Sequence, residues 1–133
     1  LDCQFVLDRA GLTIADVDIF IPHQANIRII NAVGSKLGID PSKTVVTIDK
    51  FGNTSAASIP ISLCEALKGD VIKGGDTILI ASFGAGLSCG AALLKWGTST
   101  KNTVDTHFSI PPFQGDVRDL LADSFSYHGI NYN

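Results

Sequence analysis

The sequence predicts an α/β protein in which a mixed β-sheet is layered with helices. Apolar stretches at 18–21, 44–48 and 77–81 lack the polar alternation of half-exposed strands, which is typical of strands inside a layered sheet. Between them, apolar or small residues predominate over 25–37 and 55–67 at lengths that suit helices. With a further strand at the end, the order β-α-β-α-β-β favours a mixed sheet covered by helices.

The first elements follow from local signals. The chain opens inside a helix that carries Phe5 and Val6 and stops at Gly11. Because this helix has no cap, we expect the sequence to be part of a longer chain. A strand near 18–21 follows. The helix near 25–37 ends at Gly38, and its apolar residues lie at helical spacing: Ile27, Ile30, Val33 and Leu37.

The middle of the chain predicts a strand and a buried helix. Residues 44–48 are rich in β-branched side chains and predict a strand. Residues 55–67 are apolar or small on almost every side, so we expect a helix that is buried all round. Pro60 must either kink this helix or lie near its true start.

The last predicted strands are joined by a glycine loop. A continuous apolar strand over 77–81 leads to a tight loop at 83–87, and 89–96 forms the final strand. After Trp96 the sequence becomes polar, and one short amphipathic helix is expected over 116–125. We therefore treat 97–133 as a C-terminal extension of unknown role.

Composition limits the function classes. The 133 residues suit one domain with a real core, and the apolar fraction of 45% suggests that another domain or subunit covers part of the surface. A net charge of −3 with scattered basic residues argues against nucleic acid as the main partner. No apolar run reaches the roughly 18 residues of a membrane span. Three irregularly spaced cysteines give neither a disulfide framework nor a metal site, and they fit a reducing, cytoplasmic compartment.

Two polar side chains stand where an apolar strand or a turn gives way to a helix. His23 follows the strand at 18–21, and Asn53 precedes the helix at 55–67. Both can donate a hydrogen bond without carrying charge, because the positive end of the following helix disfavours a charged imidazole and an amide does not titrate. Two neutral donors that point into one cleft would stabilise negative charge on a carbonyl oxygen.

Three motifs then carry a resemblance. They are Ile21-Pro22-His23-Gln24-Ala25-Asn26-Ile27-Arg28, Gly52-Asn53-Thr54-Ser55-Ala56-Ala57-Ser58-Ile59-Pro60 and Ser82-Phe83-Gly84-Ala85-Gly86-Leu87-Ser88-Cys89-Gly90-Ala91-Ala92-Leu93. In this order and spacing, the chain resembles the C-terminal half of β-ketoacyl-acyl-carrier-protein synthase III, an enzyme of thiolase-like fold. The resemblance covers residues 1–96, which would form a catalytic half-domain.

The resemblance implies roles for individual residues. His23 and Asn53 would be two members of a Cys-His-Asn catalytic set. Phe83, Gly84 and Ala85 would form the loop that borders the acyl pocket and supplies an oxyanion donor, with Ala85 where the family has glycine. Arg28 would lie near the entrance, where the family binds coenzyme A or acyl carrier protein.

None of the three cysteines of the sequence is expected to be the nucleophile of this catalytic set. In the family the nucleophile lies in the N-terminal half. Cys3, Cys64 and Cys89 occur in a helix, a buried helix and a strand, and none has the helix N-terminus or adjacent base that activates a thiolate. The half that carries the nucleophile is therefore an expected partner.

The resemblance implies an acyltransferase of fatty acid biosynthesis. Its reaction is a decarboxylative Claisen condensation of acyl-coenzyme A with malonyl-acyl-carrier protein, and no cofactor beyond these substrates is expected. Acyl carrier protein would be a partner, and a cytoplasmic homodimer is expected, with no nucleic acid and no membrane span.

Other interpretations stay open at this point. The chain could be a non-catalytic half-domain that binds a partner or a carrier protein, or a relative that transfers acyl groups without decarboxylation. His23 could be a structural residue, Asn53 a turn or cap, Phe83 simple core packing and Arg28 a solvated charge. Gln24 and Asn26 could orient the His23 ring or cap the helix that follows.

Overall fold

The computed structural model describes residues 2–84, 86 and 88–97. Ala85, Leu87 and residues 98–133 lie outside the described part. The expected extension, with its helix over 116–125, therefore falls almost entirely beyond it.

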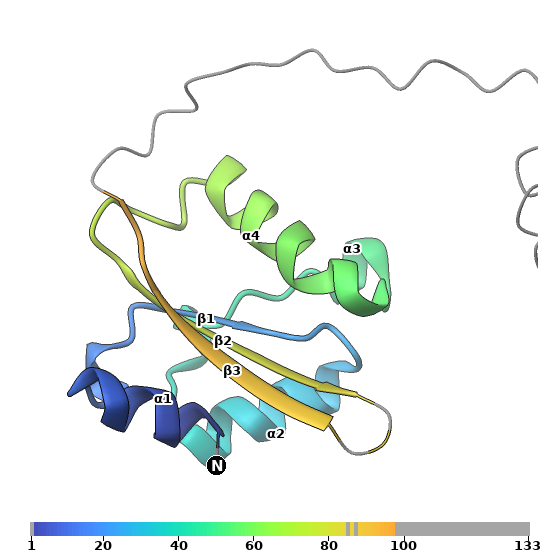
Figure 1. Ribbon diagram of the computed structural model, residues 1–133. Coiled ribbons are helices and arrows are strands. Elements are labelled where there is room, and N and C mark those ends of the chain that lie inside the picture. Colours follow the sequence, from blue (N-terminus) through green and yellow to red (C-terminus); the bar gives the residue numbers. More distant parts are fainter. Residues whose placement is uncertain (1, 85, 87, 98–133) are drawn as a thin grey trace, which may run out of the picture. The chain divides into compact units, whose positions relative to one another are not determined.

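A three-stranded mixed sheet forms the centre of the described fold (Figure 1). Strand β1 (Ile19–Pro22) runs parallel to β2 (Thr77–Gly84), and β2 pairs antiparallel with β3 (Ser88–Lys95), in the order β1-β2-β3. The strand β1 is buried at all four positions, as its uninterrupted apolar sequence predicts. The predicted mixed sheet is confirmed.

Helices cover both faces of this sheet (Figure 1). Helices α1 (Asp2–Ala10) and α2 (Ile27–Leu37) lie on one face, whereas α3 (Ile48–Phe51) and α4 (Ser58–Lys68) lie on the other. Helix α1 packs on β2 and β3, and α4 packs on β1. Three 3-10 turns complete the described elements: η1 (Ile14–Asp16), η2 (Pro41–Lys43) and η3 (Ser55–Ala57).

The core is divided by the sheet into two clusters. Alternate residues of a strand point to opposite faces, so Phe20 packs toward α1 and α2 while Ile19 and Ile21 pack toward α4. Leu79 and Ile78 divide in the same way on β2. Side chains on both faces of β1 and β2 are packed in the core. This packing holds in place the residues that follow β1 and those at the end of β2.

Helix α2 begins and ends with recognisable caps. Asn26 Oδ1 accepts a hydrogen bond from the Arg28 N–H at 2.8 Å, and Gly38 ends the helix with a left-handed φ of 75°. Ile30 is fully buried, but Ile27 is 44% exposed. Val33 and Leu37 are partly buried, so the exposure falls along this set from Ile27 to the residues further along the helix.

The predicted strand over 44–48 is wrong. Thr44 makes a single parallel bridge to Phe20, and the Val45 N–H donates to the Phe20 carbonyl at 2.9 Å. The chain then turns into α3 at Ile48. The segment does not continue as a strand, because the buried Gln24 side chain accepts the N–H groups of Thr47 and Ile48.

Helix α4 also differs from the expectation. Its buried residues are Ser58, Ser62 and Ala66, which form one stripe, so it is not buried all round in this chain. The helix begins at Ser58 after the 3-10 turn η3. Pro60 therefore lies in the first turn, where its missing N–H costs no helical hydrogen bond, and this confirms one of the two alternatives for that residue.

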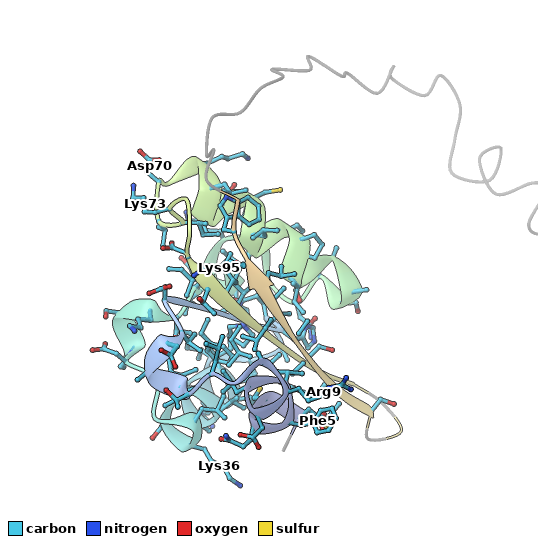
Figure 2. The ribbon with its side chains drawn as sticks, turned by 60° about the vertical axis from the view of Figure 1, so that its left-hand side comes forward. Phe5, Arg9, Lys36, Asp70, Lys73 and Lys95 are labelled. Carbon is cyan, nitrogen blue, oxygen red and sulfur yellow. The ribbon has the colours of Figure 1, made fainter. Side chains whose placement is uncertain are left out.

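Several charged side chains on the described surface form exposed pairs. Figure 2 shows Phe5 beside Arg9 on α1, with the guanidinium 5.8 Å from the ring centroid. Asp70 and Lys73 lie close together in the turn after α4, at 3.8 Å. Exposed pairs of this kind contribute little to stability. Within the described ranges, none of the helices combines the length and apolar character that crossing a bilayer demands.

Candidate active site

One edge of the sheet gathers the ends of several elements. His23 directly follows β1, and its N–H donates to the Ala81 carbonyl at 2.7 Å, which extends the β1–β2 pairing. Because β1 and β2 are parallel, the carboxyl end of β2, with Phe83 and Gly84, lies at the same edge. The first turn of α4 reaches this edge through Ser58. The edge therefore holds residues from all three predicted motifs.

The His23 ring is held from two sides. Its Nδ1 lies 2.6 Å from Ser58 Oγ, at the first residue of α4. The Phe83 ring meets it edge to face, with 5.5 Å between centroids and 67° between planes. Both contacts restrict the rotation of the half-buried imidazole, so the ring presents a fixed edge to its surroundings.

Gln24 fixes the backbone around His23. Its side chain is 1% exposed and uses all of its hydrogen-bonding capacity. Nε2 donates to the carbonyls of Pro22 at 2.9 Å and Val45 at 3.2 Å, while Oε1 accepts from the N–H groups of Thr47 at 2.8 Å and Ile48 at 3.2 Å. Gln24 thus ties the His23 loop to the segment before α3, and Asn26 alone caps α2.

Asn53 is anchored through its side-chain oxygen. Asn53 Oδ1 accepts the Ser55 N–H at 2.9 Å, which assigns the oxygen end of the amide, because a backbone N–H needs an acceptor. The Nδ2 group has no hydrogen-bond partner among the described residues. Gly52 precedes it at φ 68° and ψ −159°, a conformation that essentially only glycine adopts. Of the two structural alternatives for Asn53, the turn is confirmed, whereas Thr54 and not Asn53 is the N-cap residue of η3.

A cavity of about 330 Å³ opens beside His23. Its described lining residues come from the β1 edge, the η3–α4 segment and the end of β2: His23, Ser55, Ala56, Ser58, Ile59, Ser82, Phe83 and Gly84. Asn53 is not among them, but it bonds Ser55, which is. The structure therefore brings together His23, Phe83 and Gly84, with Asn53 one hydrogen bond from the lining.

Two other predicted positions differ. Phe83 and Gly84 are not in a loop but at the end of β2, paired with Cys89 and Ser88, because the antiparallel pairing continues to the tip of the hairpin. Ala85 lies outside the described residues. Arg28 is exposed in the first turn of α2 and lines a separate hollow of about 550 Å³ together with Asp49.

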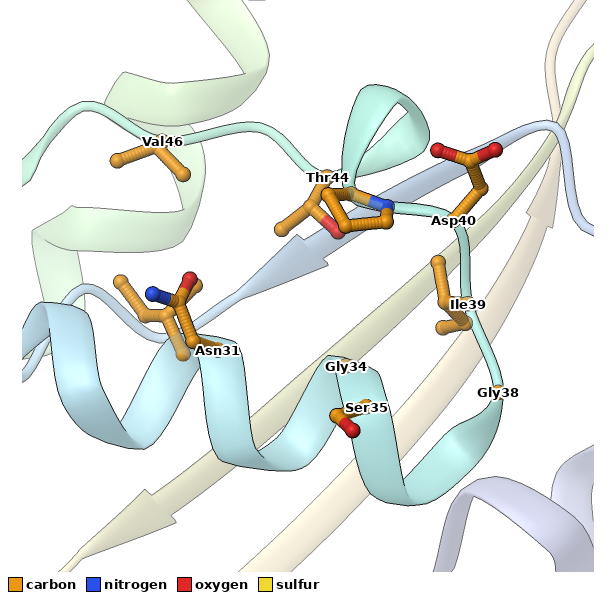
Figure 3. Close-up of a pocket in the computed structure, with 10 residues that line it drawn as sticks. Asn31, Gly34, Ser35, Gly38, Ile39, Asp40, Thr44 and Val46 are labelled. Carbon is orange, nitrogen blue, oxygen red and sulfur yellow. The ribbon is translucent and has the colours of Figure 1, made fainter.

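A larger hollow lies away from this edge (Figure 3). It has a volume of about 750 Å³ and lies between α2 and the segment 38–46, with Asn31, Ser35 and Thr44 on its walls. Among its described lining residues, Asp40 supplies the one carboxylate, and this group caps the turn η2 by accepting the Ser42 N–H at 2.8 Å.

None of the three cysteines is among the described residues that line the His23 cavity. Burial raises the pKa of the Cys3 thiol, which disfavours a thiolate. Cys64 is exposed on α4, and Cys89 is paired with Phe83 across the hairpin, but neither is a described lining residue of the His23 cavity. Among the described residues, no three His, Cys, Asp or Glu side chains form a cluster that could hold a metal ion.

The sequence analysis missed Ser58 and Ser82 as lining residues. One feature of the sequence could have pointed to Ser58. It stands two residues before Pro60, and if this proline lies in the first turn of a helix, Ser58 begins that helix. Ser82 carried no signal beyond its place in the third motif.

The fold defines a class: the C-terminal part of a thiolase-like α/β fold. Residues 7–96 match the family described as 3-oxoacyl-[acyl-carrier-protein (ACP)] synthase III C terminal. The chain therefore belongs to the β-ketoacyl-acyl-carrier-protein synthase III family.

Individual relatives agree with this membership. The chain is 48% identical over 116 residues to β-ketoacyl-[acyl-carrier-protein] synthase III 2 of Vibrio vulnificus, which covers 87% of this chain and 32% of that protein. It matches 3-oxoacyl-[acyl-carrier-protein] synthase III of Aquifex aeolicus with a TM-score of 0.70 and 53% identity, over 71% of this chain and 31% of that one. The priming β-ketosynthase of the R1128 polyketide pathway matches with a TM-score of 0.64 and 38% identity, over 71% and 29%. The chain thus spans about a third of the length of these relatives.

Proposed function

We propose that this chain supplies His23 and Asn53 as two neutral hydrogen-bond donors to the active site of a β-ketoacyl-acyl-carrier-protein synthase III. One observation carries the proposal: the Asn53 amide is anchored through its oxygen to Ser55, which lines the same cavity as His23. An anchored oxygen leaves the Nδ2 hydrogens for another acceptor. The His23 ring is likewise anchored through Nδ1, which leaves Nε2.

The proposed chemistry is the decarboxylation of a malonyl thioester. Loss of carbon dioxide places negative charge on the thioester oxygen of the resulting enolate. Two donors fixed before the reaction stabilise this charge in the transition state, and each is worth about 10²–10³ in rate. The enolate carbon then attacks an acyl thioester, which forms the new carbon–carbon bond and releases the enzyme thiolate.

The nucleophile of the proposed reaction lies outside this chain. The acyl thioester would form on a cysteine of an N-terminal half, because Cys3, Cys64 and Cys89 are not described lining residues of the cavity. Acyl-coenzyme A and malonyl-acyl-carrier protein are the proposed substrates, and no further cofactor enters the scheme.

Arg28, exposed at the start of α2, is proposed to bind an acidic substrate group or the carrier protein. The complete protein is proposed to be a cytoplasmic homodimer, and residues 97–133 an extension of the catalytic half-domain 1–96.

A second candidate keeps the same site and changes the pathway. The similarity to a priming β-ketosynthase of polyketide biosynthesis favours a condensation that starts a polyketide instead of a fatty acid. The His23 and Asn53 donors would act identically. Turnover of a panel of acyl-coenzyme A starters by the complete synthase separates the two candidates.

The donor pair is tested by three variants of the complete synthase: His23→Ala, Asn53→Ala and Asn53→Asp. The carboxylate that Asn53→Asp introduces keeps the acceptor for the Ser55 N–H but carries no donor. We expect each variant to lose at least about 10²-fold in malonyl decarboxylation. Acylation by acyl-coenzyme A, followed by mass spectrometry, should change much less.

Asn31→Ala is the matched control, because Asn31 is an exposed amide on α2 that lines the larger hollow. It should decarboxylate at the normal rate. Normal decarboxylation in the His23 and Asn53 variants as well would contradict the donor pair and leave the chain as a binding or structural half-domain.

A further inference from the structure

We infer that Ser58 is a positioning residue that fixes the tautomer of His23, by donating its hydroxyl proton to Nδ1 and so leaving the ring proton on Nε2. Ser58 lies outside the proposed donor pair of His23 and Asn53. Its consequence for catalysis rests on the proposed function, but the direction of the hydrogen bond does not.

The geometry couples the two residues tightly. Ser58 is 1% exposed, and its Oγ lies 2.6 Å from His23 Nδ1, which is a short distance for a hydrogen bond. The two residues are 35 positions apart and come from the end of β1 and the first turn of α4. Helix α4 is itself seated on β1, so neither partner can move without disturbing the core.

The direction of this hydrogen bond follows from counting protons. Ser58 Oγ already accepts the Gln24 N–H, at 3.3 Å, and it carries one proton of its own. Among the described residues, the only other hydrogen-bond partner of this hydroxyl is His23 Nδ1. A buried hydroxyl proton that pointed elsewhere would have no acceptor and would cost free energy. The proton therefore belongs on the Oγ–Nδ1 line, and Nδ1 accepts.

A neutral imidazole has one proton to place, so a ring whose Nδ1 accepts must carry it on Nε2. Nε2 has no hydrogen-bond partner among the described residues, and the ring lines the cavity beside Phe83. The hydrogen bond from Ser58 thus selects the His23 tautomer in which Nε2 carries the proton and can donate it to a substrate in the cavity. The Gln24 N–H contributes by holding the hydroxyl oxygen as its acceptor.

The test combines spectroscopy with kinetics. In the complete synthase with ¹⁵N-labelled histidine, at a pH where the ring is neutral, Nδ1 of His23 should resonate as an unprotonated nitrogen and Nε2 as a protonated one. Ser58→Ala should shift the population toward the other tautomer and slow malonyl decarboxylation by at least about tenfold. This is less than the roughly 10²–10³-fold of a donor removed outright, because the donating tautomer stays partly populated. Ser58→Thr keeps a hydroxyl and should retain both the signal and most of the rate.

Ser62→Ala is the matched control, because Ser62 is one turn further along α4, is fully buried and bonds Thr47 Oγ1 at 2.7 Å without touching His23. It should leave the His23 tautomer unchanged even if it lowers stability. An equal effect of Ser62→Ala on the tautomer would overturn the assignment.

Two outcomes separate this inference from the proposed function. A wild-type spectrum with the proton on Nδ1 overturns the inference, even if Ser58→Ala fails to fold, and so does an unchanged tautomer in a folded Ser58→Ala. A proton on Nε2 that moves in Ser58→Ala, in a synthase whose His23→Ala variant decarboxylates normally, upholds the Ser58 contact and removes the proposed function instead.

Discussion

The side-chain oxygen of Gln24 accepts the backbone N–H of Thr47 at 2.8 Å, across 23 positions of the chain. Thr47 precedes α3, and α3 leads directly to Gly52 and Asn53. The residue next to His23 therefore holds the segment that delivers Asn53. The buried Gln24 amide therefore connects the segments that carry the two proposed donors, His23 and Asn53.

Replacing Gln24 by Glu should destabilise the fold strongly. The carboxylate keeps the acceptors for Thr47 and Ile48 but removes both donors, so the carbonyls of Pro22 and Val45 lose their partner in a buried site. We expect a loss of roughly 2–4 kcal/mol in the free energy of unfolding, measured by chemical denaturation. Gln4→Glu makes the same change on exposed α1, beside Asp8, and should cost only about 0.2–0.5 kcal/mol. Equal effects of the two substitutions would contradict the clamp.

Replacing Gly52 by Ala should strain the turn that presents Asn53. With φ at 68° and ψ at −159°, an alanine here would cost roughly 1–3 kcal/mol although nothing lies within 4 Å of its Cβ. Gly34→Ala is the contrasting control, because Gly34 lies in α2 and its Cβ would meet only Thr44 Oγ1 at 3.8 Å. Thermal melting should fall in Gly52→Ala and hold or rise in Gly34→Ala. A melting temperature unchanged by Gly52→Ala would show that the turn has another conformation.

Replacing Phe83 by Leu should loosen the His23 ring. Leucine keeps much of the apolar volume but loses the edge-to-face contact, which is worth about 0.5–1.5 kcal/mol. Decarboxylation should fall less than in His23→Ala, since the donor itself remains. Phe5→Leu, on exposed α1, serves as the control and should behave as wild type in the decarboxylation assay. If Phe83→Leu matches His23→Ala in rate, Phe83 contributes more than packing.

Two exposed aspartates should set part of the acid sensitivity. The Thr13 N–H and hydroxyl lower the pKa of Asp16 from its ordinary 3.8, and the Ser42 N–H does the same for Asp40. A lowered folded pKa means that the contribution to stability is complete above 3.8 and is lost as the pH falls through the lowered value. Denaturation midpoints should therefore depend less on pH below 4 in Asp16→Asn and Asp40→Asn.

The control for charge loss is Asp49→Asn, because no hydrogen bond joins the Asp49 carboxylate to other described residues. Stability should depend less on pH below 4 in the Asp16 and Asp40 variants than in Asp49→Asn. A wild-type slope in the Asp16 and Asp40 variants would show that these hydrogen bonds do not persist in solution.

Strand β1 and the first half of β2 could be predicted because they are buried on both faces. β1 is buried at all four positions, β2 is buried or partly buried over 77–81, and the sequence shows an uninterrupted apolar run at both places. The segment 44–48 shows the limit of this argument. Its β-branched residues resemble a strand, but the Gln24 side chain takes the N–H groups of Thr47 and Ile48, and no local pattern reveals a partner 23 positions away.

Some candidate site residues could be predicted from the sequence and others could not. His23, Asn53 and Phe83 could be proposed as site residues because each stands in a recognisable motif at the end of an element. Ser58 could not be given a role, since its importance lies in one contact with His23 that depends on how α4 is seated on β1. Burial of α4 was overestimated because its apolar residues exceed what this chain alone can cover.

The most direct test is a crystal structure of the complete synthase with a non-hydrolysable malonyl thioester. The account predicts His23 Nε2 and Asn53 Nδ2 both within about 3 Å of the thioester oxygen. An oxygen that contacts neither nitrogen, or an Asn53 amide turned away from the His23 cavity, would contradict it.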